Sequence, residues 1–165
     1  MARVEPMSHQ LTQESVWDYP RPPRLERTDK RIIVNIEGVV LADTTEAYRV
    51  LETSHPPVYY LPAAGIQMQY LARTARHSFC EFKGNATYWT VKIGHRIEED
   101  CAWSYERPSA GFEAIRGYIA FYAGRMDACT VAGEPVIPQP GGFYGGWITK
   151  DIVGPFKGGP GSRGW

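Results

Sequence analysis

The stretch TYWTVKIGHRIEEDCAWSY, residues 87–105, decides the fold class. Its first half alternates apolar and polar residues up to Ile93. The turn Gly94-His95 follows, and residues 96–105 return as a second extended segment. Alternation with a period of two is typical of a strand with one buried face, and a glycine turn between two such segments is typical of a hairpin. The stretch therefore predicts two paired antiparallel strands.

The composition extends this prediction to the whole chain. Of 165 residues, 13% are aromatic, 17 are glycine and 13 are proline, which favours short strands and turns over long helices. With 43% hydrophobic residues, a chain of this length can bury one core that is stable without disulfide bonds or bound metal ions. We expect a mainly β, single-domain protein with short helices.

Several further elements are predicted from local patterns. A short helix is expected over 43–52, because Asp43-Thr44-Thr45-Glu46 resembles an N-terminal cap and the apolar residues that follow share one helical face. The other predicted elements are a hairpin at 31–42, an edge strand at 58–62, a strand at 66–71, a helical turn within 113–118 and a last hairpin at 118–131.

The chain divides into three regions by composition. Residues 1–30 form an N-terminal extension whose Trp17 and Tyr19, set among prolines, are expected to dock on the body. Residues 31–137 form the β domain. Residues 138–165 are rich in glycine, proline and aromatic rings, and rings at intervals favour packing on the body or on a partner subunit. The aromatic ends could therefore form a homodimer interface.

Charge and cysteine usage exclude several classes of protein. Eighteen basic residues balance eighteen acidic ones, so no general attraction to nucleic acid or to an anionic membrane is expected. The three cysteines form no Cys-x-x-Cys pair, which argues against a disulfide framework and a zinc site. No signal peptide or membrane-spanning segment is apparent, so we expect a cytoplasmic protein without metal or cofactor.

Cys80 and Lys83 lie in the stretch HSFCEFKGNATYW and raise the question of a reactive thiol. A nearby cation would favour the thiolate. In an extended stretch, however, residues three apart point to opposite faces, and a lone cysteine is usually a small buried residue. We interpret Cys80 as packed rather than nucleophilic. Glu52, placed unfavourably for a carboxylate at a predicted helix end, suggests a cationic partner, with Lys83 the obvious candidate.

The densest aromatic set comprises Tyr59, Tyr60, Tyr88, Trp89, Trp103 and Tyr105. On a strand, Trp103 and Tyr105 share a face, whereas Tyr88 and Trp89 point to opposite faces. Such rings either pack in the core or line a small-molecule pocket with polar tips, and we favour the pocket. The spacing of the histidines His55, His77 and His95 matches no metal motif, and each is expected to be exposed at a turn.

Four ordered motifs resemble the bacterial and fungal family known as domain of unknown function 427. They are LETSHPPVYYLP, CEFKGNATYW, DCAWSYERP and GYIAFYAGRMD, within about residues 31–136. The flanks WDYPRPPRLE and GGWITKDIVGPFKGGPGSRGW look like the longer bacterial subtype.

This resemblance implies a β-tent, two antiparallel sheets meeting at an angle, similar to methionine sulfoxide reductase B and the ligand-binding domain of cereblon. Those relatives usually carry a zinc site of two Cys-x-x-Cys pairs, which this sequence lacks. The family is also labelled nucleotidyltransferase-like, but the expected Gly-Ser and Asp-x-Asp elements are missing. As site residues, the motifs point to Glu52, Tyr60, Cys80, Lys83, Gly84, Trp103 and Tyr105. In the cereblon domain a cage of aromatic rings holds the ligand, and the resemblance implies a similar role for Trp103 and Tyr105.

The sequence therefore predicts a small-molecule-binding or ligand-sensing domain with an aromatic pocket. The predicted ligand-binding residues are Glu52, Tyr60, Lys83, Tyr88, Trp103 and Tyr105. The alternative is an enzyme that uses Cys80, or a Glu52 and Lys83 pair, for redox or group-transfer chemistry.

Overall fold

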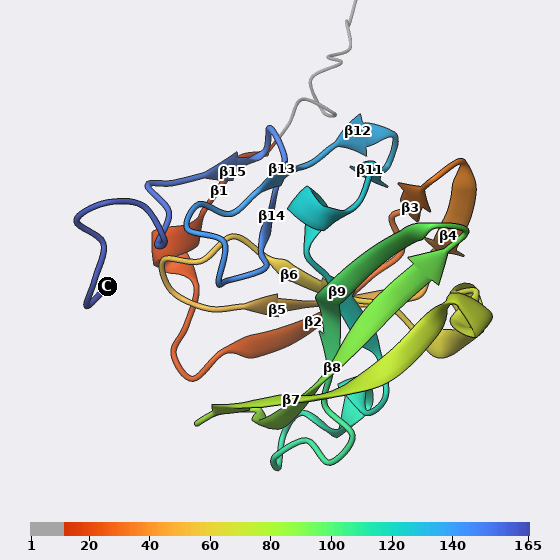
Figure 1. Cartoon of the computed structure of the whole chain (residues 1–165). Coiled ribbons are helices and arrows are strands. Elements are labelled where there is room, and N and C mark those ends of the chain that lie inside the picture. Colours follow the sequence, from red (N-terminus) through yellow and green to blue (C-terminus); the bar gives the residue numbers. More distant parts are fainter. Residues whose placement is uncertain (1–11) are drawn as a thin grey trace, which may run out of the picture.

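The computed structural model describes residues 12–165, which form strands of two to ten residues joined by turns (Figure 1). The helical elements are single 3-10 turns, η2 (Val16–Asp18), η3 (Ala63–Gly65), η4 (Met68–Tyr70), η5 (Glu113–Ile115) and η6 (Ala123–Arg125). Most strand pairs are antiparallel, so the predicted mainly β class is confirmed. The first eleven residues of the predicted N-terminal extension lie outside the described residues.

The first sheet contains the two strands from which the fold was predicted. It has the order β10-β9-β8-β7. Tyr88 lies opposite Trp103 across the β8–β9 ladder, so the predicted pairing of residues 87–105 is confirmed. Tyr88 and Trp89 point to opposite faces and enter different clusters of buried side chains. The strands are β7 (Leu71–Cys80), β8 (Gly84–Ile93), β9 (Arg96–Ser104) and β10 (Ile119–Phe121).

The second sheet has the order β12-β11-β3-β4. The predicted first hairpin is present as β3 and β4. The predicted last hairpin is wrong, because β10 pairs with β9 in the first sheet whereas β11 pairs with β3 in the second. The turn η6 between them carries the chain from one sheet to the other. The strands are β3 (Ile32–Ile36), β4 (Val39–Thr44), β11 (Ala128–Val131) and β12 (Glu134–Pro135).

The third sheet, β2-β5-β6, replaces the predicted helix over 43–52. Its strands are β2 (Arg24–Thr28), β5 (Ala47–Leu51) and β6 (Val58–Tyr60). The expected cap is a tight turn in which the Glu46 N–H donates to Thr44 Oγ1. The apolar residues of this stretch suit a strand as well as a helix, and backbone pairing with β2 and β6 on both sides decides for the strand.

The link between the third and first sheets follows β6. Leu61 and Ile119 exchange backbone hydrogen bonds of 2.9 and 2.8 Å, so β6 is joined to β10 beyond its own sheet. The strand predicted over 66–71 is wrong, because η3 and η4 occupy most of this region and β7 begins only at Leu71. Ile66 is nevertheless buried in the core, which accounts for the apolar signal at that position.

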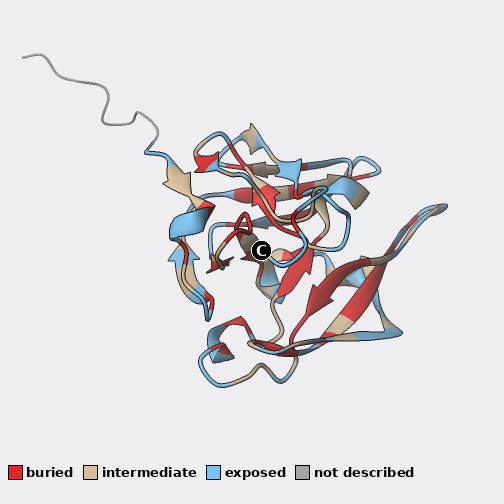
Figure 2. Ribbon diagram, turned by 90° about the vertical axis from the view of Figure 1, so that its left-hand side faces the viewer, coloured by how far each residue is buried: buried red, intermediate tan, exposed pale blue. Residues whose placement is uncertain are grey.

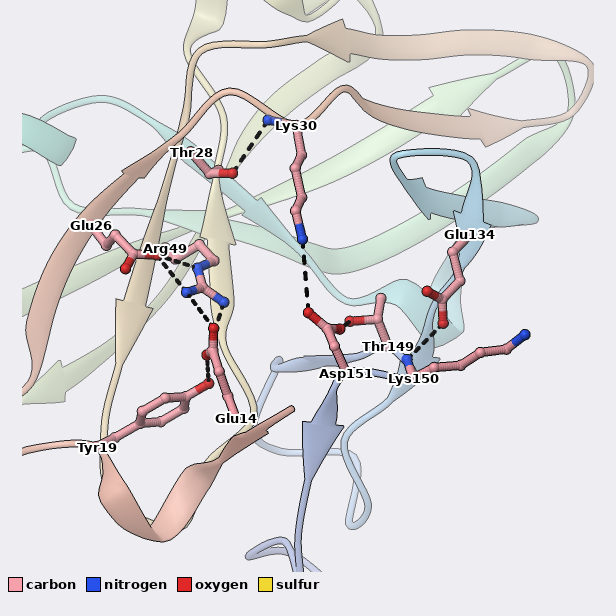
Figure 3. Close-up of polar contacts among 10 residues, drawn as sticks. All are labelled: Glu14, Tyr19, Glu26, Thr28, Lys30, Arg49, Glu134, Thr149, Lys150 and Asp151. Carbon is pink, nitrogen blue, oxygen red and sulfur yellow. Dashed lines mark hydrogen bonds and ion pairs between the residues drawn. The ribbon is translucent and has the colours of Figure 1, made fainter. Parts of the chain in front are cut away.

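The two ends of the described chain lie side by side. β1 (Glu14–Ser15) pairs in parallel with β15 (Ile152–Val153), and β13 (Ile137–Pro138) pairs with β14 (Trp147–Ile148). Side chains reinforce this arrangement (Figure 3): Arg49 Nη2 lies 3.1 Å from Glu14 Oε1, and Lys30 Nζ lies 3.7 Å from Asp151 Oδ2.

Buried residues follow the inner faces of the sheets (Figure 2). The main core gathers aliphatic side chains from β3, β4, β8 and β9 together with Trp147, whose Nε1 donates to the Phe121 carbonyl oxygen at 3.0 Å. A second, largely aromatic cluster lies on the opposite face of β8 and β9. No helix within residues 12–165 has the length and apolar character needed to cross a membrane.

Candidate functional site

A cavity of about 350 Å³ opens beside the second, aromatic cluster. We call it the aromatic cavity. Its ring walls come from β6, β8 and β9, and its far wall comes from a C-terminal loop, residues 139–146, which we call the strap. The lining residues used below are Glu52, His55, Tyr60, Cys80, Lys83, Tyr88, Trp103, Tyr105, Tyr122, Gln139, Tyr144, Gly145 and Lys157.

The six residues predicted as ligand-binding all line this one cavity. Four are rings, and the other two are Glu52, just after β5, and Lys83, in the turn before β8. Cys80, at the end of β7, lines it as well. Strands β6, β8 and β9, together with the segments that follow β5, β7 and β9, thus bring the predicted residues together.

The rings are held in fixed orientations by edge contacts and hydrogen bonds. Trp103 Nε1 donates to the Tyr60 hydroxyl at 3.2 Å, and the ring centroids of Tyr60 and Tyr105 are 6.1 Å apart. The Tyr88 hydroxyl lies 3.0 Å from Ser78 Oγ. Burial raises the pKa of Tyr60 and Tyr105 well above the ordinary tyrosine value, so both phenols are neutral at physiological pH. The walls therefore offer flat apolar surfaces with neutral hydroxyls at their edges.

Glu52 pairs with Arg21 and not with Lys83, the candidate partner named from the sequence. Its Oε2 lies 3.3 Å from Arg21 Nε, and Arg21 also donates to the Thr53 carbonyl oxygen at 2.8 Å. The N-terminal extension thus supplies the cation, because it lies against the end of β5. A Glu52 and Lys83 ion pair is absent from the described residues.

Lys83 is held in the cavity wall with its charge facing the cavity. It is 8% exposed, and its backbone carbonyl accepts a hydrogen bond of 2.9 Å from the Ser109 N–H. Its Nζ lies 5.9 Å from the centroid of the Tyr105 ring. Within residues 12–165 we find no ion pair or side-chain hydrogen bond that engages this ammonium.

His55 is buried, contrary to the prediction that it would be exposed. It is 8% exposed because the strap folds over it: the Tyr144 ring lies 4.8 Å away and Gln139 Nε2 lies 3.1 Å from His55 Nδ1. Burial, together with the positive charges of Lys157, Arg21 and Lys83, lowers the pKa of His55 to about 4. His55 is therefore a neutral hydrogen-bonding group at pH 7. His77 and His95 are exposed, as predicted, but His77 lies within β7 and not at a turn.

The strap residues were not predicted as part of the site. Gly145 lies so close to the indole of Trp103 that an added Cβ would stand 2.1 Å from Trp103 Cη2. Gln139 fixes the loop by accepting a hydrogen bond from the Gly146 N–H at 3.0 Å. The rings between glycines indicated that this segment docks, but no local pattern in the sequence indicated which surface it covers.

A metal centre has no support in the described part of the chain. Within residues 12–165, no three His, Cys, Asp or Glu side chains are grouped so that they could hold a metal ion. The cysteines are all free: Cys101 and Cys129 are buried, and Cys80 is half-buried at the cavity.

The sequence model of a protein family described as "Domain of unknown function (DUF427)" matches residues 24–132. The match begins at β2, includes all strands of the three main sheets except β12, and ends before the strap. The comparison with curated proteins gives no match.

Proposed function

The chain belongs to the DUF427 family, and because the description of that family states no activity, we propose a function from the aromatic cavity: it binds a small organic molecule. The observation that carries the proposal is the convergence of the Tyr60, Trp103 and Tyr105 rings on one cavity of about 350 Å³. This volume lies at the small end of the range of about 300–1,000 Å³ typical of ligand sites.

The chemistry of the walls supports a ligand with a flat apolar body. Rings fixed by hydrogen bonds lose little conformational freedom when a ligand binds, and they offer large contact areas. The hydroxyl of Tyr88, 3.0 Å from Ser78 Oγ, gives a polar group that can orient the ligand. The strap adds Tyr144 and Gly145 to the far side, so a bound molecule would be contacted from opposite sides.

The test is native mass spectrometry of the protein purified from its own host. We expect a non-covalent mass that is lost on gentle denaturation, and that is reduced or missing in Trp103→Leu. The matched control is Trp17→Leu, since Trp17 is exposed and does not line the cavity. Circular dichroism checks that both variants fold.

The proposal would be contradicted by wild-type protein that carries no additional mass and shows no thermal stabilisation by any member of a broad aromatic fragment panel. Equal retention of the molecule by Trp103→Leu and wild type would place the binding site elsewhere on the protein.

A further inference from the structure

Lys83 carries a positive charge that the described protein does not neutralise. Burying an ammonium group without a partner is unfavourable, so such groups are normally paired. The Tyr105 ring compensates only in part, because 5.9 Å is close to the limit at which a cation–π contact contributes. Within residues 12–165, Ser54 Oγ is the single fully buried polar side-chain atom without a hydrogen-bond partner. The Lys83 ammonium also has no such partner among these residues, so it is not fully buried, and it faces the open space of the cavity that Lys83 lines.

The surrounding charges favour an anion at this end of the cavity. The charged lining residues are Glu52, Glu81, Lys83 and Lys157. Glu52 is engaged by Arg21, and Glu81 is exposed at the rim, where solvent screens its charge. Lys157 Nζ donates to the main-chain oxygen of Trp165 at 3.2 Å. Among residues 12–165, neither Lys83 nor Lys157 forms an ion pair with an Asp or Glu side chain.

His55 lies in the same field, and its Nε2 is 3.9 Å from Glu52 Oε2, the carboxylate that Arg21 engages. Its pKa is lowered by burial and by Lys157, Arg21 and Lys83, which means that these three cations lie around one buried position. Because His55 is neutral, it adds no charge but can hydrogen-bond. An anionic group near Lys83 would thus lie close to the ammonium groups of Lys83 and Lys157 and to the neutral imidazole of His55.

We infer that the ligand of the aromatic cavity is a small aromatic acid, whose carboxylate or phosphate oxygens bind Lys83 while its ring packs among Tyr60, Trp103 and Tyr105. This inference rests on the proposed function and adds the chemical class of the ligand. Lysine is suited to either anion because it acts as a point charge with three donors. Lys83 is therefore the residue that selects acids over neutral molecules of the same shape.

The experiment is calorimetric titration with a panel of small aromatic acids, each matched by its neutral amide or alcohol. Carboxylates and phosphate monoesters form separate arms, which distinguish the two kinds of anion. We expect acids to bind more tightly than their neutral partners. In Lys83→Met we expect that affinity to fall by about ten- to a hundred-fold, the range for losing a hydrogen bond to a charged group.

Two further variants keep the result interpretable. Lys83→Arg retains the charge and should keep most of the preference for acids. Lys92→Met removes an exposed lysine of β8 outside the cavity and should bind like wild type. Thermal unfolding of Lys83→Met shows whether the variant is folded at the titration temperature.

The titrations distinguish a wrong ligand class from a cavity that binds no small molecule. Neutral partners that bind as tightly as acids, or acids that bind equally to Lys83→Met and wild type, would overturn the anionic class and leave small-molecule binding standing. A neutral co-purified molecule would do the same. Wild-type protein that binds no panel member and carries no co-purified molecule would overturn both.

Discussion

At the scale of the residue, the three cysteines differ in how deeply they are buried. Burial raises the pKa of Cys101 to about 11 and that of Cys129 to about 12, so both remain thiols near neutral pH. Cys80 lies half-buried at the aromatic cavity. Since the thiolate is the form that reacts, accessibility and burial together determine which cysteine is modified.

We expect iodoacetamide at pH 8 to add one group to the native protein, at Cys80. Peptide mass spectrometry over time measures the site and the rate. Cys80→Ser should remove this reaction, and a bound ligand should slow it in the wild type. Rapid modification of Cys101 or Cys129 would contradict the packing described for the main core.

Among single residues, the sequence predicted the directions of neighbouring rings but not the contacts of polar side chains. Alternation along β8 correctly separated Tyr88 from Trp89, because side-chain direction in a strand is a local property. Lys83 was only a candidate partner for Glu52, and the cation found there is Arg21, which reaches Glu52 because the N-terminal segment folds against β5. His55 looked exposed because its cover comes from the distant residues Gln139 and Tyr144.

At the scale of the element, the strap depends on glycine at its closest approach. An alanine at position 145 would bring Cβ to 2.1 Å from Trp103 Cη2, so either the indole or the strap must move. We expect Gly145→Ala to destabilise the protein by about 1–3 kcal/mol, as for overpacking in a core. Urea unfolding followed by fluorescence measures the change.

Gly159→Ala is the matched control in the same C-terminal segment. Nothing lies within 4 Å of a Cβ added at Gly159, so this variant should unfold at nearly the wild-type urea concentration. If Gly145→Ala were as stable as Gly159→Ala, the strap would not be packed against Trp103.

Elements were predicted correctly where the pattern allowed one structure. Residues 87–105 combine alternation with a glycine turn, and they form β8 and β9. Residues 43–52 fit two periods, and a helix was predicted because the pairing of this stretch with β2 and β6 could not be seen in the sequence. The segment 118–131 contains two strands and a turn, yet each strand pairs with a different sheet, and pairing between sheets is a long-range property.

At the scale of the whole molecule, ionic contacts join the N-terminal segment to the third sheet. Arg49 contacts both Glu14 and Glu26, and Tyr19 donates to Glu14 (Figure 3). Burial alone would raise the pKa of Glu14, but the hydrogen bonds from Tyr19 and Arg49 outweigh it and hold the pKa below the ordinary value of 4.5. Glu14 therefore stabilises the folded state in its charged form.

We expect Glu14→Gln to lower the free energy of unfolding by about 1–3 kcal/mol at pH 7, the range for hydrogen bonds to a charged group. A carboxyl whose pKa is lowered on folding stabilises above its unfolded pKa, and this stabilisation is lost as the pH falls through the folded value. The difference from wild type should thus shrink below pH 4.5, the ordinary glutamate value.

Urea unfolding across this pH range measures the effect, and Glu46→Gln, which changes an exposed carboxylate, is the control. A difference between Glu14→Gln and wild type that stays constant from pH 7 to pH 3 would show that the ionised carboxylate does not contribute.

The position of the strap late in the sequence affects how the protein folds during its synthesis. The residues that cover Trp103 are translated more than thirty positions after it, as Gly145 shows. A nascent polypeptide can fold its sheets first, as segments emerge in order, but its rings remain open to water until the strap arrives. A premature stop codon before Gln139 would leave this aromatic surface permanently uncovered. Such a product would be a target for chaperones and proteases, which recognise exposed apolar patches.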